Sequence, residues 1–163
     1  MRQLDARTAH LVAADLLTRR PWTRAELARR LIRRGASGEV ADTVVADLTA
    51  RGYLDDAAYA RQWVESRSAR GYGAARLRAE LRVRGVDAAV VDAALGGLTP
   101  HATLDRALAL ARRRLSVIAR GRPERVAPRL SEYLLRRGYA QSVVVRVVRE
   151  LTRVGVTTDQ GFR

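Results

Sequence analysis

The sequence contains no cysteine, which excludes disulfide bonds, thiolate nucleophiles and thiolate metal sites. Aromatic residues make up only 5% of the 163 residues, whereas hydrophobic residues make up 47%. The core must therefore consist mainly of Ala, Val and Leu, which favours closely packed helices. No apolar run approaches the roughly 20 residues that span a bilayer, and the N-terminal stretch does not resemble a signal peptide. We expect a cytoplasmic protein with no membrane contact.

Lysine is also absent, so all 31 basic residues are arginines. With 17 acidic residues, the formal net charge is +14, which attracts a polyanion such as nucleic acid or an acidic protein surface. Arginine binds phosphate and carboxylate through two parallel hydrogen bonds and stacks on aromatic rings, whereas lysine acts more as a point charge. A GC-rich genome also favours arginine over lysine, so this choice alone does not establish a function.

Motifs of catalysis are missing from the sequence. The two histidines, His10 and His101, lie in no recognisable motif, and there is no nucleophile elbow, zinc-ligand cluster or Walker motif. Gly71-Tyr72-Gly73 is not preceded by the strand of a dinucleotide fold, and Arg76 occupies the third glycine position. It is interpreted as a turn between helices. We predict that the protein is not an enzyme and that it has no cofactor or metal.

A repeat runs through the chain. Three segments read Leu-x-x-x-Leu-x-x-Arg-Gly, and their glycines are Gly35, Gly85 and Gly138, which are 50 and 53 residues apart. Leu at i and i+4 marks one face of a helix, and glycine supplies the left-handed residue that ends it. Apolar residues recur five, ten and thirteen positions after the glycine: Val40, Val90 and Val143; Val45, Leu95 and Val148; Leu48, Leu98 and Leu151. A second helix therefore follows each glycine.

A further helical stretch precedes each Leu pair, at residues 6–17, 56–69 and 101–115. The sequence thus predicts an all-α fold of three tandem three-helix repeats that bury their cores locally and stack on their neighbours. The predicted boundaries are 5–54, 55–98 and 99–154. Residues 96–101 form the clearest linker, residues 120–125 form a basic turn, and residues 155–163 form a disordered tail.

Asp55 and Asp56 precede the helical stretch of the middle repeat. Aspartate is a preferred N-cap residue and suits the positive end of a helix dipole. We interpret the pair as helix caps rather than as an acid–base pair. In the first repeat, Thr23 and Glu26 have the spacing of a capping box.

Arginines recur at equivalent places around the Leu pairs, and few acids interrupt them. We predict that they form a surface that binds a partner or DNA. Its candidate residues are Arg29, Arg33, Arg67, Arg70, Arg76, Arg78, Arg82, Arg84, Arg136 and Arg137.

Residues 52–85 resemble the RecX family of recombination regulators. The matching residues, in order, are Tyr53-Leu54-Asp55-Asp56, Tyr59-Ala60, Arg67, Gly71-Tyr72-Gly73, Arg76-Leu77 and Glu80-Leu81. The resemblance extends over residues 8–153. It implies a curved, elongated array of three-helix repeats, in agreement with the repeat pattern.

The resemblance also implies a function. RecX-like proteins bind the filament that RecA forms on single-stranded DNA and inhibit its ATPase, strand-exchange and co-protease activities. This inhibition restrains recombination and the SOS response. The partners would be the RecA filament and single-stranded DNA, which is contacted directly or through the filament, and we expect a monomer. No catalytic residues are implied.

An alternative is a protein that binds DNA directly, with a three-helix repeat docking as a helix-turn-helix. Base readout in the major groove favours Asn or Gln beside Arg on the recognition helix. The helices that carry the Leu pairs contain no amide side chains, which disfavours this alternative.

Overall fold

The structure is a computed structural model that describes residues 4–158, and its regular elements in this range are α-helices and one 3₁₀ helix, η1. An isolated bridge between Leu4 and Ala36 is the β pairing found in this range. The elements are α1 (Ala6–Arg19), α2 (Arg24–Arg33), α3 (Gly38–Ala50), α4 (Asp56–Ala69), α5 (Ala74–Val83), α6 (Ala88–Leu95), α7 (Pro100–Ile118), η1 (Pro123–Arg125), α8 (Val126–Arg136) and α9 (Gln141–Thr158).

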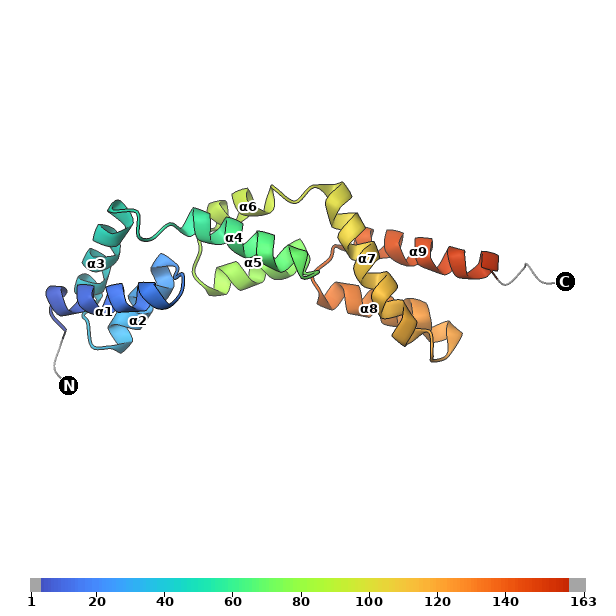
Figure 1. The fold of residues 1–163 in the computed structure, drawn as a ribbon, viewed down its shortest axis with the longest axis horizontal. Helices are drawn as coiled ribbons and strands as arrows, with labels where there is room; N and C mark the ends of the chain where they lie inside the picture. Colours follow the sequence, from blue (N-terminus) through green and yellow to red (C-terminus); the bar gives the residue numbers. More distant parts are fainter. Residues whose placement is uncertain (1–3, 159–163) are drawn as a thin grey trace. The chain divides into compact units, whose positions relative to one another are not determined.

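The helices follow the predicted repeat, and the prediction of an all-α fold of tandem three-helix repeats is confirmed. Each repeat contributes three helices: α1–α3, α4–α6 and α7–α9 (Figure 1). The predicted boundaries at 54/55 and 98/99 fall in the connections between helices. α9 continues to Thr158 and so includes residues 155–158 of the segment predicted to be a disordered tail; residues 159–163 lie outside the described residues.

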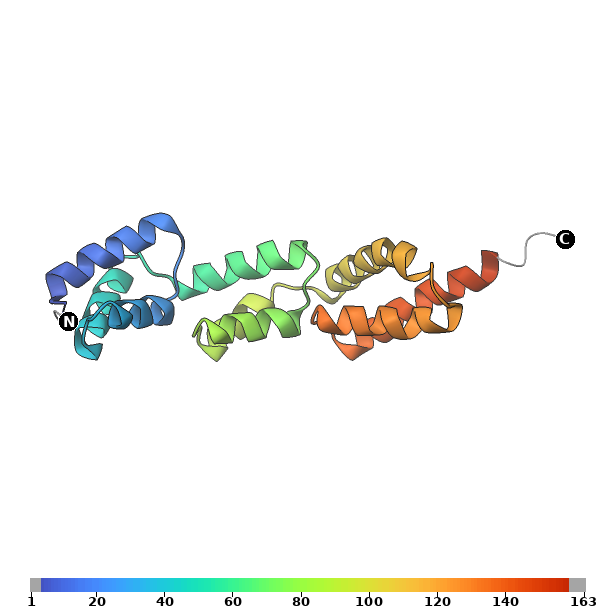
Figure 2. The same cartoon turned by 90° about the horizontal axis from the view of Figure 1, so that it is seen from below.

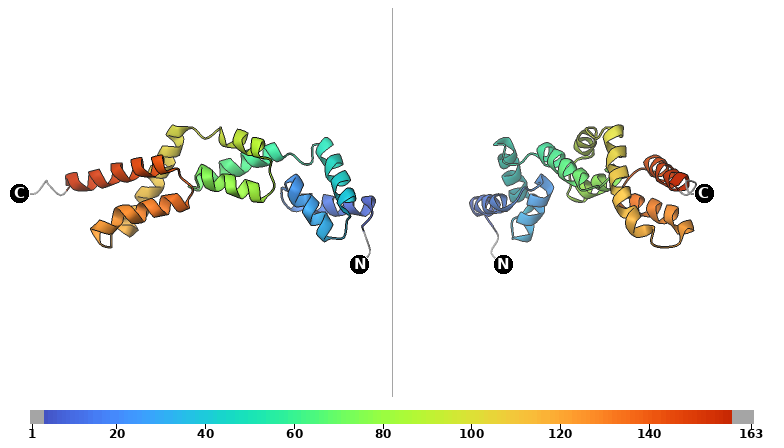
Figure 3. Two further views of the ribbon diagram at one scale, coloured as in Figure 1. Left: turned by 180° about the vertical axis from the view of Figure 1, so that it is seen from behind. Right: turned by 45° about the vertical axis from the view of Figure 1, so that its right-hand side comes forward.

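The chain divides into two compact units, and the division runs through α4 and α5. The first unit comprises the residues up to Trp63 together with Glu80–Ala94, and the second comprises Val64–Ala79 and the residues from Leu95 onward. In the first unit, α3 contacts both α1 and α2 (Figure 3). In the second unit, α7, α8 and α9 contact one another (Figure 2).

The Leu pairs form the centre of the repeats, as predicted. All six leucines are fully buried: Leu27, Leu31, Leu77, Leu81, Leu130 and Leu134. On the helix after the glycine, however, the residue that is fully buried in every repeat lies six positions after the glycine, at Ala41, Val91 and Val144. The residues five positions after it are only partly buried. The sequence pattern misses this position because in the first repeat it is occupied by the small residue Ala41 rather than by a large apolar residue.

The glycine that ends each middle helix has the predicted left-handed conformation. The φ angles are 102° at Gly35, 78° at Gly85 and 89° at Gly138. At Gly85 the next amide, of Val86, donates to the Leu81 carbonyl at 3.1 Å, and the Gly85 amide donates to the Arg82 carbonyl at 2.9 Å. This Schellman pattern satisfies two carbonyls at the end of α5.

The two aspartates stabilise two different helices. Asp55 is the predicted cap of α4, because its carboxylate accepts a hydrogen bond from the Ala58 amide at 2.9 Å. Asp56, by contrast, lies in the first turn of α4, and its carboxylate accepts from the Arg24 amide at 2.9 Å, at the start of α2. The interpretation as a cap of α4 is therefore confirmed for Asp55 and wrong for Asp56, whose carboxylate binds the start of a helix in the preceding repeat.

Replacing Asp55 or Asp56 with Ala should lower the free energy of unfolding by ~0.5–2 kcal/mol, because each variant leaves a helix N-terminus with one acceptor fewer. Urea unfolding measures the effect. Replacing Asp42, an exposed residue of α3, provides the control and should change the stability by less than about 0.5 kcal/mol. Equal stabilities for all three variants would contradict the capping role.

Candidate polyanion-binding site

In the first unit, the N-terminus of α2 meets the C-terminus of α5, and we call this contact the first joint. The hydroxyl of Thr23, a fully buried residue, donates to the Arg84 carbonyl at 2.6 Å. Gly85 lies so close to Ala25 that a Cβ at Gly85 would collide with the Ala25 methyl group. The contact brings the positive end of one helix dipole to the negative end of another, which is favourable.

The positive charges of the first joint are balanced by acids. The Arg84 guanidinium lies 3.2 Å from a Glu26 carboxylate oxygen and 4.1 Å from the centre of the Trp63 ring. The Trp63 indole in turn donates to the Glu80 carboxylate at 3.0 Å. Glu26 also completes the predicted capping box of α2 with Thr23. The charge of Arg84 is therefore used within the fold.

The second unit contains an equivalent second joint, where the N-terminus of α5 meets the C-terminus of α8. The Gly73 amide donates to the Arg137 carbonyl at 2.7 Å, and the Ala75 amide donates to the Gly138 carbonyl at 3.2 Å. A Cβ on Gly73 would collide with the Gly138 carbonyl oxygen. Glycine is required here by close backbone approach, and the Gly-Tyr-Gly segment is the turn between helices that the sequence predicts.

Arginines gather around Tyr72 at the second joint. The guanidinium carbons of Arg67, Arg76 and Arg137 lie 4.2, 4.5 and 4.7 Å from the centre of its ring. Arg137 also lies 5.3 Å from the centre of the Tyr133 ring, where Arg114 approaches at 5.3 Å. These distances are those of cation–π contacts. The resulting row of alternating charges and rings, the arginine–tyrosine ladder, consists of Arg67, Tyr72, Arg76, Arg137, Tyr133 and Arg114.

The two joints differ in charge at equivalent positions. On the helix that contributes its N-terminus, the first joint has Glu26, nine residues before Gly35, and the second has Arg76, nine residues before Gly85. On the helix that contributes its C-terminus, the first joint has Glu80, five residues before Gly85, and the second has Tyr133, five residues before Gly138. Arg84 therefore meets a carboxylate where Arg137 meets a second guanidinium across Tyr72. The second joint thus has an arginine and a tyrosine at the two positions where the first joint has glutamates.

A hollow of about 310 Å³ lies beside the ladder, between α7 and α8. It is lined by Arg114, Val117, Ile118, Arg129, Glu132, Tyr133 and Arg136. Glu132 forms an ion pair with Arg136, so a single acid faces three arginines in the lining. The hollow extends the positive surface beyond Tyr133.

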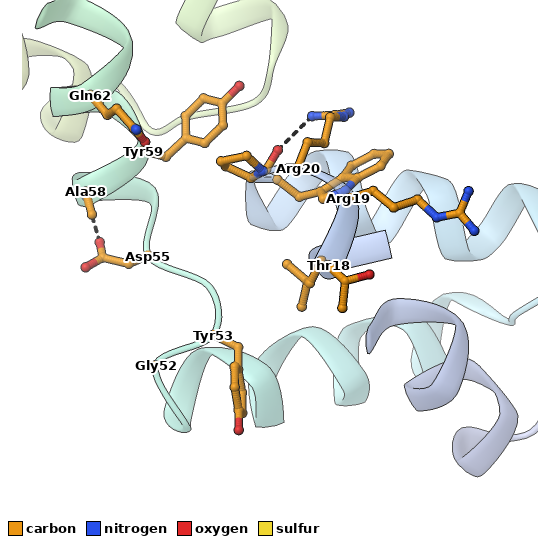
Figure 4. A pocket seen from close by; sticks show the side chains of 12 residues that line it. Thr18, Arg19, Arg20, Gly52, Tyr53, Asp55, Ala58, Tyr59 and Gln62 are labelled. Atoms are coloured by element: carbon orange, nitrogen blue, oxygen red, sulfur yellow. Dashed lines mark hydrogen bonds between the residues drawn. The ribbon is translucent and has the colours of Figure 1, made fainter. Parts of the chain in front are cut away.

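A second hollow, of about 580 Å³, lies in the first unit between the α1–α2 corner and the start of α4. Tyr59 and Arg20 lie toward one end of it and Tyr53, which is 66% exposed, toward the other (Figure 4). Arg20 stacks 3.5 Å from the centre of the Trp22 ring and pairs with Glu26 at 3.3 Å, and Arg19 pairs with Asp15. The charges of Arg19 and Arg20 are thus paired with acids within the fold.

The predicted binding arginines separate into three groups. The second joint brings together Arg67, Arg76 and Arg137 at Tyr72, while the Arg70 and Arg136 carbonyls accept hydrogen bonds from Arg137 and Arg76. Arg84 belongs to the first joint, where Arg29 donates to the Val83 carbonyl at 3.3 Å. Arg33, Arg78 and Arg82 are exposed residues of α2 and α5.

Tyr72, Tyr133 and Arg114 are ladder residues that the predicted set lacks. Tyr72 is difficult to recognise from the sequence, because the glycines on either side of it indicate only a turn. Alignment of the repeats could have identified it, because Tyr72 lies thirteen residues before Gly85 and the aromatic Trp22 lies thirteen residues before Gly35. Within residues 4–152, where side chains are described, no group of three or more His, Asp or Glu residues is placed to hold a metal ion. No described helix is long and apolar enough to cross a membrane.

Comparison with known proteins identifies relatives that match most of the chain. Residues 9–48 match the family model for the first three-helix domain of RecX, and residues 55–95 match the model for the second. The regulatory protein RecX of Thermobifida fusca is 44% identical over 154 residues, which cover 93% of this chain and 83% of that protein. The regulatory protein RecX of Mycobacterium ulcerans is 44% identical over 142 residues, which cover 86% and 82%.

A solved structure has the same fold. The crystal structure of RecX from Lactobacillus salivarius superimposes with a TM-score of 0.81 over 90% of this chain and 96% of its own, at 17% sequence identity.

Proposed function

The chain belongs to the RecX family, and we propose that it binds the RecA filament on single-stranded DNA and inhibits its activities. The relatives are described as regulatory proteins, which supports a regulatory role for this chain. We infer that inhibition covers ATP hydrolysis, strand exchange and co-protease activity, and so restrains recombination and the SOS response. The protein acts in the cytoplasm as a monomer, without a cofactor and without catalysis of its own.

The arginine–tyrosine ladder is the observation that supports this function best. A RecA filament on DNA offers two anionic surfaces, the phosphates and the acidic side chains of the protein. Arginine is suited to both, because its planar guanidinium donates two parallel hydrogen bonds to a phosphate or a carboxylate. The net charge of +14 adds long-range attraction to either surface.

The DNA-dependent ATPase of the cognate RecA tests the proposal. Protein added below one molecule per RecA protomer should slow ATP hydrolysis on single-stranded DNA. The same assay with a shorter DNA lattice reports whether inhibition requires an extended filament. Hydrolysis that continues at its full rate with equimolar protein would exclude inhibition of the filament.

A further inference from the structure

We propose that the hairpin of α7 and α8 binds one nucleotide of a single-stranded nucleic acid in the hollow between the two helices, with Arg114 and Arg129 holding its phosphate. The arginines of the connecting turn bind the neighbouring phosphates of the strand. Both helices belong to the second unit and contact each other (Figure 2). This inference deepens the proposed function and rests on it only for the identity of the nucleic acid.

Positive charge is concentrated in this hairpin. Residues 112–136 contain eight arginines and two acidic residues, so this stretch carries six of the fourteen net positive charges of the chain. All eight arginines are exposed residues: Arg112, Arg113, Arg114, Arg120, Arg122, Arg125, Arg129 and Arg136. A field of this sign attracts a polyanion to the hairpin and raises its rate of encounter.

Acids within the described residues balance two of these eight charges. Arg112 lies 3.5 Å from a Glu150 carboxylate oxygen, and Arg136 forms an ion pair with Glu132. For the other six arginines, no ion pair is found among the residues that the structure describes. Both existing pairs are exposed to solvent, and such pairs are weak. A phosphate therefore meets unpaired guanidiniums and can compete for the paired ones.

Two arginines of the hollow are held in place by contacts within the hairpin. Arg114, from α7, lies 5.3 Å from the centre of the Tyr133 ring, which is a cation–π contact. Arg129, from α8, lies against the turn, since a Cβ on Gly121 would be only 3.1 Å from its Nη1 atom. A guanidinium keeps several N–H donors at its edge for phosphate oxygens. Because both side chains are already ordered, less entropy is lost on binding.

The lining of the hollow favours a nucleotide over an acidic side chain. Val117, which is 52% exposed, Ile118 and Tyr133 add apolar and aromatic surface beside the arginines. Proteins bind single strands by combining positive charge for the phosphates with aromatic surface for the bases, whereas an acidic side chain has no apolar ring to cover such a surface. The volume of about 310 Å³ lies at the lower end of the ~300–1,000 Å³ of small-ligand sites, so the hollow suits a single nucleotide.

Glu132 is the acid in the lining of the hollow, and its carboxylate opposes a phosphate there. Replacing it with glutamine (Glu132→Gln) removes this repulsion and releases Arg136 from its ion pair. Binding of oligothymidylate should therefore tighten by about 2- to 5-fold. The control is Glu124→Gln, which makes the same charge change at an exposed residue of η1 outside the lining. It should have a smaller effect, since it does not contact the ligand.

Removing an arginine of the hollow should have the opposite effect. Arg129→Gln should weaken binding of oligothymidylate by about 10-fold, because one charge-assisted contact is lost. The slope of log K against log salt concentration should fall by about 0.7 in magnitude. The control is Arg149→Gln, which makes the same charge change at an exposed residue of α9 in the same unit and should lose less affinity. Arg114→Gln is the second variant of the hollow and replaces Arg129→Gln if that protein does not fold.

Fluorescence anisotropy with labelled oligothymidylate, at several salt concentrations and without RecA, measures these affinities, and circular dichroism verifies that each variant is folded. Three outcomes would overturn the inference. The first is an Arg129→Gln protein that binds as tightly as Arg149→Gln. The second is a Glu132→Gln protein that binds no more tightly than Glu124→Gln. The third is polyglutamate that binds the wild type as tightly as oligothymidylate of equal charge, which would assign the hairpin to an acidic protein.

The same measurements separate this inference from the proposed function, because RecA is absent from them. A wild-type protein that binds oligothymidylate through the hairpin but leaves the RecA ATPase unchanged would overturn the proposed function alone. A wild-type protein that inhibits the ATPase while the hairpin variants bind oligothymidylate like their controls would overturn this inference alone.

Discussion

Reversing two charges of the ladder, with Arg67→Glu and Arg76→Glu together, is expected to weaken binding to the RecA–DNA filament by about 100-fold. The reason is the loss of two charge-assisted contacts at ~1.4 kcal/mol each. Both side chains lie on Tyr72 in the second unit. Fluorescence anisotropy with labelled DNA in preassembled filaments measures the affinity, and circular dichroism verifies that the variant is folded.

The matched control for this variant is Arg78→Glu with Arg82→Glu, which makes the same change in net charge on α5 but outside the ladder. Both residues are exposed and belong to the surface predicted from the sequence. The control should weaken binding by less than about 10-fold, through the general field of the protein, and added salt should remove this loss because exposed charges are screened. Equal losses in the two variants would mean that the arginine surface as a whole, not the ladder, is the contact.

Removing the third repeat is expected to reduce filament affinity by about 10²–10⁴-fold, because contacts joined in one chain act at a high effective concentration. The cut falls after Gly96, between α6 and α7. This cut removes no part of α4, α5 or α6, but it takes away α8 and the Arg137 and Gly138 carbonyls after it, which accept hydrogen bonds from the Gly73 and Ala75 amides. The fragment therefore also loses the Arg137 side of the ladder.

Titration of filaments with the fragment and with the full-length Arg67→Glu, Arg76→Glu variant separates the two effects. If the third repeat makes contacts of its own, the fragment binds more weakly than the variant, and inhibition is recovered only in part at high concentration. Solubility and helix content must be verified first, since the cut exposes the surface that α8 covers. A folded fragment that inhibits as well as the full chain would reduce the third repeat to a structural cap.

The repeat could be predicted from the sequence because its signals are local. A Leu pair four residues apart and a glycine four residues after it determine where a helix is buried and where it ends, and the fully buried Leu77 and Leu81 before Gly85 follow this pattern. Asp55 was predictable as a cap for the same reason, since its partner, the Ala58 amide, is three residues away. The end of α9 at Thr158 was not predictable in this way, because the polar composition of the C-terminal residues obscures the continuing helix.

The ladder was not predictable to the same degree, because contacts distant in sequence determine the role of each arginine. Arg84 and Arg137 occupy the same position before their glycines, and nothing local distinguishes them. Glu26, 58 residues away, neutralises Arg84, whereas Arg137 meets Tyr72. Similarly, the partner of Asp56 is the Arg24 amide, 32 residues away. Such pairs become visible only when the helix ends are brought together.

The most direct test of the account is the single-stranded-DNA-dependent ATPase of the cognate RecA, titrated in parallel with the wild-type protein and the Arg67→Glu, Arg76→Glu variant. The account predicts that the wild type inhibits hydrolysis below one molecule per RecA protomer and that the variant requires about 100-fold more protein for the same inhibition, following the affinity difference. Hydrolysis unaffected by equimolar wild-type protein would contradict the proposed function. Inhibition at equal concentrations by both proteins would contradict the assignment of the ladder as its contact surface.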